Sequence, residues 1–220
     1  MARFFRNNGL TIVLMLLFLG SIIGQWLAGV HFENQQLIEH GEQPISAIAF
    51  LSDPLFLSTV FENWESEFLQ MSAYVLLTCF LFQKGSAESA DPDEPPRDHD
   101  LARQARKPGA PRILGAGRLA RALYAQSLGI ALALLFVLSF LMHWVFSARE
   151  AAAEAAIHGR PGPTMLEYLG DAQLWFESFQ NWQSEFLSTA VLVVLSIYLR
   201  QRESPESKAV AAPHSQTGAD

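Results

Sequence analysis

The sequence predicts an all-α integral membrane protein of four transmembrane helices, arranged as two parallel tandem two-helix repeats with helical extensions on the outer side. Three observations lead to this fold class. The apolar residues gather in four blocks, the basic residues avoid two of the segments between blocks, and the second half of the chain repeats the first. Only 17% of the 220 residues are charged, whereas a soluble domain carries about 25%.

The four apolar blocks have the length of membrane crossings. A bilayer core of about 30 Å needs roughly 20 mostly apolar helical residues. The alternative is a soluble four-helix bundle, but its helices would need a polar face, and Leu10–Ile23 and Ile130–Leu141 have none. None of the blocks contains lysine, arginine or aspartate. The predicted crossings are residues 9–30, 64–82, 123–146 and 182–199.

The basic residues predict the orientation of these crossings. Thirteen of the 15 lysines and arginines lie before the first block, between the second and third blocks, or after the fourth. The segment from His31 to Asn63 has none, and the segment between the third and fourth blocks has only Arg149 and Arg160. Cytoplasmic loops carry an excess of lysine and arginine, so the N- and C-termini are predicted to be cytoplasmic.

The second half of the chain matches the first half without a gap. FENWESEFL at Phe61–Leu69 aligns with FQNWQSEFL at Phe179–Leu187, 118 positions later, and Trp26 aligns with Trp144 at the same offset. A unit with two crossings returns to the side from which it started, so both copies run in the same direction. Parallel repeats are related by a pseudo-two-fold axis along the membrane normal, so we expect equivalent residues at the same depth.

Each repeat is expected to continue its first helix beyond the membrane. Glu150–His158 is a run of strong helix formers, and Gly159 follows it as the predicted residue after the helix end. Gly41 stands at the same place in the first copy. Asp53 and Asp171 are expected to cap the N-termini of the returning helices.

The predicted organisation has four parts. Residues 1–86 and 119–204 are the two-helix repeats, 87–118 a flexible cytoplasmic linker and 205–220 a disordered cytoplasmic tail. The linker has almost no large apolar residues, so it cannot bury enough surface to become ordered. Its basic residues Arg103, Arg106 and Lys107 are expected to be ordinary cytoplasmic charge, with contact to anionic lipid headgroups as the alternative.

The candidate binding residues lie in the repeated motif. If Trp64 marks the outer headgroup level, Glu67 lies one turn deeper, about 4–5 Å further in. Carboxylates inside a membrane helix are costly and usually face protein or water. The two-fold axis would bring Glu67 and Glu185 to one depth, which suggests a shared proton or a bound cation. The candidates are Asn63, Trp64, Ser66, Glu67, Asn181, Trp182, Ser184 and Glu185, with Gln25 and His143 as weaker members.

The same residues also have a purely structural explanation. An asparagine cap and a glutamate in the first turn suit the N-terminal end of a helix, and tryptophan is common at the membrane interface. Polar side chains also join helices to each other within membranes. The sequence has no phosphate loop, nucleophile motif, haem site or zinc pattern, so we predict no enzyme activity, cofactor or metal. The predicted partner is the lipid bilayer, a homo-oligomer is left open, no nucleic acid is expected, and the ligand is unknown.

The motif resembles a known family. Phe61–Met71, followed by Gln83-Lys-Gly-Ser86, is similar to small bacterial inner-membrane proteins that share a domain of unknown function with a repeated FxNWxSEFL motif. The resemblance implies a bacterial plasma (inner) membrane location but no activity. Two function classes therefore stay open. The first is a non-enzymatic structural, sensory or interaction protein; the second is a small transporter or ion-handling protein that uses Glu67 and Glu185, as an oligomer.

Overall fold

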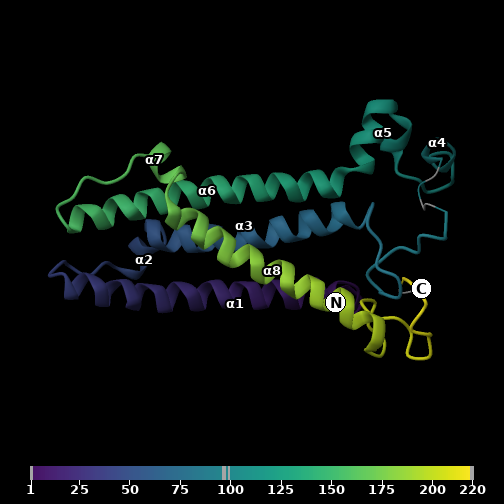
Figure 1. Cartoon of the computed structure of the whole chain (residues 1–220), viewed down its shortest axis with the longest axis horizontal. Helices are drawn as coiled ribbons and strands as arrows, with labels where there is room; N and C mark the ends of the chain where they lie inside the picture. The colour runs from purple at the N-terminus through teal and green to yellow at the C-terminus, as the bar shows by residue number, and fades with distance from the viewer. Residues whose placement is uncertain (1, 96–97, 99, 219–220) are drawn as a thin grey trace. The chain divides into compact units, whose positions relative to one another are not determined.

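The computed structural model describes residues 2–95, 98 and 100–218, and this part of the chain is helical with no strand. It contains eight α-helices and one short 3₁₀ helix (Figure 1). Their bounds are α1 Ala2–Glu39, α2 Ala47–Phe50, α3 Pro54–Leu77, α4 Leu101–Gln104, η1 Arg112–Gly115, α5 Arg118–Ala125, α6 Ser127–Ile157, α7 Met165–Leu169 and α8 Ala172–Tyr198. The all-α part of the predicted fold class is confirmed.

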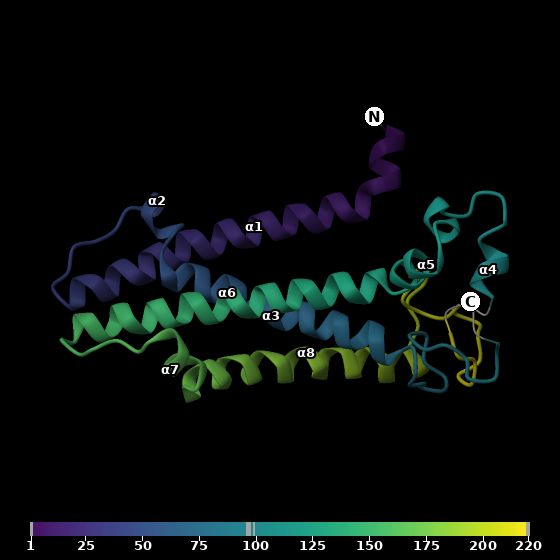
Figure 2. The same ribbon diagram turned by 90° about the horizontal axis from the view of Figure 1, so that it is seen from above.

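Two of the helices, α1 and α6, are long and apolar enough to cross a membrane. Figure 2 shows the full length of both. The 31 residues of α6 extend about 46 Å at 1.5 Å per residue, which exceeds the roughly 30 Å of a bilayer core. Large apolar side chains such as Leu16 and Leu134 are exposed on them, as contact with lipid requires.

The other two long helices, α3 and α8, contain no described stretch that is long and apolar enough to cross a membrane, because the repeated motif lies within them. Glu62, Glu65 and Glu67 all lie on α3, and Asn181 and Glu185 lie on α8. These polar residues lower the mean hydropathy of any stretch long enough to span a bilayer. The second crossing of each repeat therefore stays a prediction.

Helix α3 ends at Leu77, whereas the predicted crossing continues to residue 82. The hydroxyl of Thr78 donates to the carbonyl of Tyr74 at 2.9 Å, and the thiol of Cys79 donates to the carbonyl of Val75 at 3.3 Å. The carbonyl of Tyr74 also accepts from the backbone N–H of Thr78 at 3.0 Å, so side chains and backbone together satisfy the carbonyls where the helix ends.

The start of α6 also differs from the predicted crossing at 123–146. Residues 123–125 belong to α5, and Gln126 after them has φ −111° and ψ 7°, outside the helical region. Helix α6 then begins at Ser127, whose hydroxyl donates to the carbonyl of Tyr124 at 2.8 Å. The apolar block is therefore divided between two helices.

The chain forms two compact units, which we describe separately. The first contains Met1–Phe61 and Met142–Leu174, and the second contains Glu62–Leu141 and Trp175–Asp220. Residue 1, residues 96, 97 and 99 of the predicted linker, and residues 219–220 of the predicted tail lie outside the described residues.

In the first unit, α1 and α6 end in the same way. Gly41 and Gly159 adopt positive φ values of 78° and 66° after the two helices. The backbone N–H of Glu42 and that of Arg160 each donate to a carbonyl five residues back, at 2.8 Å. This is the Schellman arrangement, in which a glycine without a side-chain clash terminates a helix. The prediction for both glycines is confirmed.

In the first unit, the loop that follows each of α1 and α6 is tied to that helix by a tryptophan. The indole N–H of Trp26 donates to the carbonyl of Ala47 at 2.7 Å, and that of Trp144 donates to the carbonyl of Met165 at 2.8 Å. Donors and acceptors of these two bonds are both 118 positions apart. Three buried apolar positions share this offset, namely Val30, Phe50 and Phe56 in the first half and Ala148, Tyr168 and Leu174 in the second.

The two returning helices have the predicted aspartate caps. The backbone N–H of Leu55 donates to Asp53 Oδ1 at 2.9 Å, and that of Gln173 donates to Asp171 Oδ1 at 2.8 Å. The predicted caps are confirmed. Asp53 is half-buried and Asp171 is exposed, so the two sites differ in solvation. Burial raises the pKa of the Asp53 carboxyl, and the hydrogen bond from Leu55 opposes this shift.

We expect Asp53→Ala to lower the stability of the purified protein by about 1 kcal/mol, because a capping oxygen is lost. Asp53→Asn keeps that oxygen and removes the charge. Burial raises the folded-state pKa of Asp53. The stability contributed by this raised pKa is therefore present at low pH, where the side chain is protonated, and is lost as the pH rises through the folded-state pKa. At pH 7 the Asn variant should therefore be at least as stable as the wild type.

Thermal unfolding in detergent, followed by circular dichroism at pH 7 and near pH 4, measures this difference. The advantage of Asp53→Asn should disappear at the lower pH. Asp171→Asn is the matched control, and we expect it to show no gain because Asp171 is exposed. If Asp53→Asn is as unstable as Asp53→Ala, the assignment of Asp53 as a helix cap is contradicted.

In the second unit, the segments that follow α3 and α8 form equivalent loops. The backbone N–H of Gln83 donates to Ser89 Oγ at 2.9 Å, and that of Gln201 donates to Ser207 Oγ at 2.9 Å. Gly85 and Glu203, at equivalent places in these loops, have φ values of 87° and 65°. A non-glycine residue in this conformation is uncommon, so the shared geometry is specific.

The sequence predicted a disordered tail from residue 205. In the structure, Lys208 is 1% exposed, and its ammonium donates to the carbonyls of Gly85, His214 and Gln216 at 2.5, 3.0 and 2.9 Å. Gly218 N–H donates to the carbonyl of Ser86 at 2.9 Å. A buried ammonium requires such partners, because burial without hydrogen bonds is costly.

Candidate functional site

In the second unit, polar side chains join α3 to α8, which crosses α3 in Figure 1. We call these residues the α3–α8 clasp. Asn181 Nδ2 donates to Glu62 Oε1 at 2.5 Å, Trp182 Nε1 donates to Glu65 Oε1 at 2.8 Å, and Gln70 Nε2 donates to Thr189 Oγ1. The acceptors Glu62 and Glu65 are three residues apart and so lie on one face of α3. That face is the one directed at α8.

Glu65 is the most deeply buried member of the clasp. Its side chain has no exposed area. A carboxylate in this position requires a donor, because an unpaired buried charge costs several kcal/mol. The indole N–H of Trp182 supplies one at 2.8 Å.

Aromatic rings hold the indole of Trp182 in place. Its ring centroid is 6.3 Å from that of Phe136 on α6 and 5.3 Å from that of Phe179 on α8, both in edge-to-face arrangements. Trp175 continues the cluster, with ring centroids 5.9 Å from those of Phe140 and Phe179. Such pairs favour edge-on packing, so they restrict the indole to a few orientations.

The two carboxylate acceptors of the clasp, Glu62 and Glu65, are the two positions at which the motif copies differ. FENWESEFL and FQNWQSEFL are identical except that Glu62 and Glu65 are replaced by Gln180 and Gln183. At these two bonds the first copy supplies the carboxylate acceptors and the second copy the donors, whereas Gln70 of the first copy donates to Thr189 of the second. A second pair of glutamates in the second copy would add negative charge on the donor side of this contact. The difference between copies therefore fits a contact in which the two helices have distinct roles.

The predicted site residues of the first copy do not belong to the α3–α8 clasp. Asn63 and Glu67 are exposed on α3, and Trp64 is half-buried. The hydroxyl of Ser66 donates to the carbonyl of Asn63 at 2.9 Å within the helix. Both copies share these residues, whereas the acceptors Glu62 and Glu65 on α3 are residues that the copies do not share.

In the second copy, the predicted residues Asn181 and Trp182 are clasp donors. The hydroxyl of Ser184 donates to the carbonyl of Asn181 at 2.8 Å within α8. Glu185 is half-buried, and its carboxylate interacts electrostatically with that of Glu67. Binding of a proton or a cation by this pair stays a prediction.

The weaker predicted residues, Gln25 and His143, belong to the first unit. Gln25 Nε2 donates to the hydroxyl of Thr59 at 3.1 Å and so links α1 to α3. His143 lies on α6 with no exposed area. The partner of Gln25, Thr59, thus lies in the first unit.

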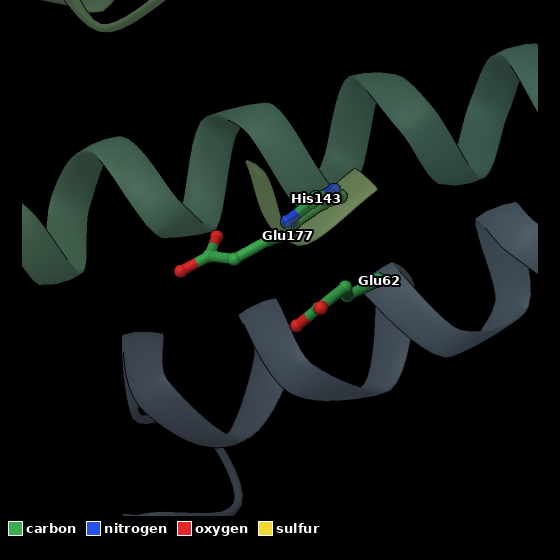
Figure 3. A group of neighbouring side chains, drawn as sticks. All are labelled: Glu62, His143 and Glu177. Carbon is green, nitrogen blue, oxygen red and sulfur yellow. The ribbon is translucent and has the colours of Figure 1, made fainter. Parts of the chain in front are cut away.

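Sequence reasoning missed a second acidic residue next to the clasp. Glu62 and Glu177, both in the second unit, each offer a carboxylate oxygen within 4.8 Å of the other. Figure 3 shows these two side chains on α3 and α8; the third side chain that it labels, His143, belongs to the first unit. Glu177 stands where the first copy has Thr59, so a further difference between the copies was the available signal.

The first unit contains a separate cavity of about 340 Å³ near the end of α1. Its lining includes the four carboxylates of Glu33, Asp53, Glu150 and Glu154, and no lysine or arginine. Glu150 accepts a hydrogen bond from the hydroxyl of Ser58 at 2.6 Å. This cavity contains none of the predicted site residues.

Comparison with protein families identifies the chain. A family model described as a domain of unknown function, DUF6766, matches residues 1–219. The chain belongs to this family. Neither a curated protein nor a solved structure matches it. The predicted membership in a family of unknown function is confirmed, and DUF6766 membership assigns no activity.

A double-mutant cycle tests the clasp in this DUF6766 protein. Trp182→Phe removes the indole donor, and Glu65→Leu removes the acceptor. We expect each single variant to lower the free energy of unfolding by about 1.5–3 kcal/mol, because each leaves a buried polar partner unsatisfied. The double variant should be less destabilised than the sum of the two, since the unsatisfied group is then gone.

Unfolding in mixed detergent and denaturant micelles gives the three values. Gln180→Leu is the matched control at an exposed position of α8, and we expect it to change stability by less than about 0.5 kcal/mol. Additive effects of the two clasp substitutions would contradict a direct hydrogen bond.

Proposed function

We propose that the chain is a multi-pass protein of the bacterial inner membrane with four crossings, both termini cytoplasmic and no enzymatic activity. Its function is structural, sensory or interaction-based, and the α3–α8 clasp joins its two repeats. The observation that carries this proposal is the one-directional pairing of Asn181 and Trp182 with Glu62 and Glu65.

The two apolar helices α1 and α6 support the crossings. Helices α3 and α8 follow them after short outer segments, and each would return to the side on which its repeat began. Their polar residues do not oppose this arrangement. Polar groups in membrane helices are tolerated where they face protein and are hydrogen-bonded, as those of the clasp are.

Equivalent contacts support the tandem repeat. The tryptophan bonds, the aspartate caps and the loops after α3 and α8 each occur twice at positions 118 apart. Two copies of one hairpin would give parallel repeats. In that arrangement α3 and α8 would be equivalent helices, and the clasp would be the contact between the copies.

The clasp favours a structural role over a catalytic one. Its donors and acceptors are bound to each other, and Glu65 has no exposed area. A catalytic carboxylate must reach a substrate, whereas these side chains are engaged in holding two helices together. Interhelical hydrogen bonds in membranes serve this purpose.

A small transporter or ion-handling protein is the second candidate. The equivalent positions of Glu67 and Glu185 in the two motif copies support it, because two carboxylates brought to one depth would attract a proton or a cation. Four helices enclose at most a narrow pathway, so transport would require an oligomer.

Cysteine labelling in intact cells tests the proposed topology. In a Cys79→Ser background, Glu42→Cys should react with an impermeant maleimide added outside. Arg103→Cys should react only after the cells are permeabilised, because cytoplasmic loops carry the basic residues. Labelling of position 103 in intact cells would reverse the proposed orientation.

Flux into proteoliposomes separates the two function classes. If Glu67 and Glu185 handle protons or cations, Glu67→Gln combined with Glu185→Gln should reduce a measured proton or potassium flux by tenfold or more, an effect of about 1.4 kcal/mol. If the role is structural, the wild-type protein should show no flux above that of empty liposomes. Gln183→Asn is the control, at an exposed position of α8 that is not a candidate binding residue.

A further inference from the structure

Helix α5 is a short amphipathic helix whose apolar side is open. Leu119 is 74% exposed and Leu123 is 55% exposed, and these residues are four apart, so they share one face. Arg118 and Arg121 lie on the other side of the same eight-residue helix. Open leucines beside arginines are typical of helices that lie in a membrane interface.

The charge around α5 is of one sign. From Leu101 to Arg149 the chain has no acidic residue, and the basic residues in the stretch before α6 are Arg103, Arg106, Lys107, Arg112, Arg118 and Arg121. Arg112 and Arg118 are exposed. Arg121 Nε donates to the carbonyl of Leu114 at 3.0 Å, which ties α5 to the buried Leu114 of η1. The segment thus presents a basic surface on a helix held in place by η1.

The orientation of α5 relative to α6 fits a membrane surface. Figure 1 shows α5 set across the end of α6, and in Figure 2 it is seen nearly end-on. The break at Gln126 makes this change of direction possible. If α6 spans a bilayer, a helix set across its first turn runs along the plane of the headgroups.

We propose that α5 and the basic segment before it bind anionic lipid headgroups at the cytoplasmic surface. In this arrangement Leu119 and Leu123 enter the acyl boundary, and Arg112 and Arg118 contact lipid phosphates. This inference rests on the proposed crossing by α6. The charge complementarity, the open leucine face and the continuity of α5 with an apolar helix together select an anionic bilayer as the occupant.

Site-directed spin labelling of the full-length protein in nanodiscs tests the proposal. In a Cys79→Ser background, one label is placed at Leu119→Cys and a matched one at Ala125→Cys, on the arginine side of α5. We expect the label at position 119 to be accessible to oxygen and protected from a water-soluble nickel complex when the nanodiscs contain phosphatidylglycerol. The label at position 125 should be accessible to the nickel complex.

The label at position 119 is then compared in a charge-reversal variant and in nanodiscs of neutral lipid. Arg112→Glu with Arg118→Glu should weaken surface binding by about fivefold for each positive charge removed, so the label at 119 should become accessible to the nickel complex. Pure phosphatidylcholine nanodiscs should give the same shift. If inorganic phosphate in phosphatidylcholine nanodiscs restores protection, the segment binds free anions and the proposal fails.

A label at Leu134→Cys in α6 distinguishes failure of the lipid-binding proposal from failure of the proposed crossing by α6. If position 134 is in lipid while position 119 stays in water with phosphatidylglycerol present, the lipid-binding proposal is overturned and the crossing holds. If both positions are in water, the proposed crossing by α6 fails as well.

Discussion

The hydrogen bonding of two glutamates on α3 is the constraint on which the account of this protein depends. Glu65 has no exposed area, and Glu62 accepts a hydrogen bond from Asn181 on α8. Helix α8 must therefore present donors opposite both carboxylates. Asn181 and Trp182 do so from adjacent positions, which fixes both the rotation of α8 and its register along α3. Few other placements of α8 would satisfy both carboxylates together.

This constraint gives a reason for the divergence of the two motif copies. Identical copies would offer glutamates on both helices, and four carboxylates would then surround one contact. Glutamine at positions 180 and 183 removes the charge from the donor helix, while the shared Asn-Trp pair is kept. Under the proposed tandem repeat, the second helices of two equivalent hairpins would in this way take different roles.

Features that depend on neighbouring residues could be predicted from the sequence. The helix ends at Gly41 and Gly159 and the caps at Asp53 and Asp171 follow from backbone geometry within one turn. The break at Gln126 escaped prediction, because Leu123 is as apolar as the block that follows it.

The clasp acceptors escaped prediction for a different reason. Which face of α3 meets α8 depends on how each helix is rotated about its axis, and identity between repeats carries no information on rotation. Shared residues such as Asn63 and Glu67 are exposed on α3. The buried contact is made by Glu62 and Glu65, residues that distinguish the copies.

The pairing of α8 with the Glu62 and Glu65 face of α3 is tested most directly by cross-linking in native membranes, in a Cys79→Ser background. The account predicts that Glu62→Cys and Asn181→Cys are joined by a short bifunctional thiol reagent, whereas Asn63→Cys and Asn181→Cys are not. Cross-linking of the second pair in preference to the first would contradict it.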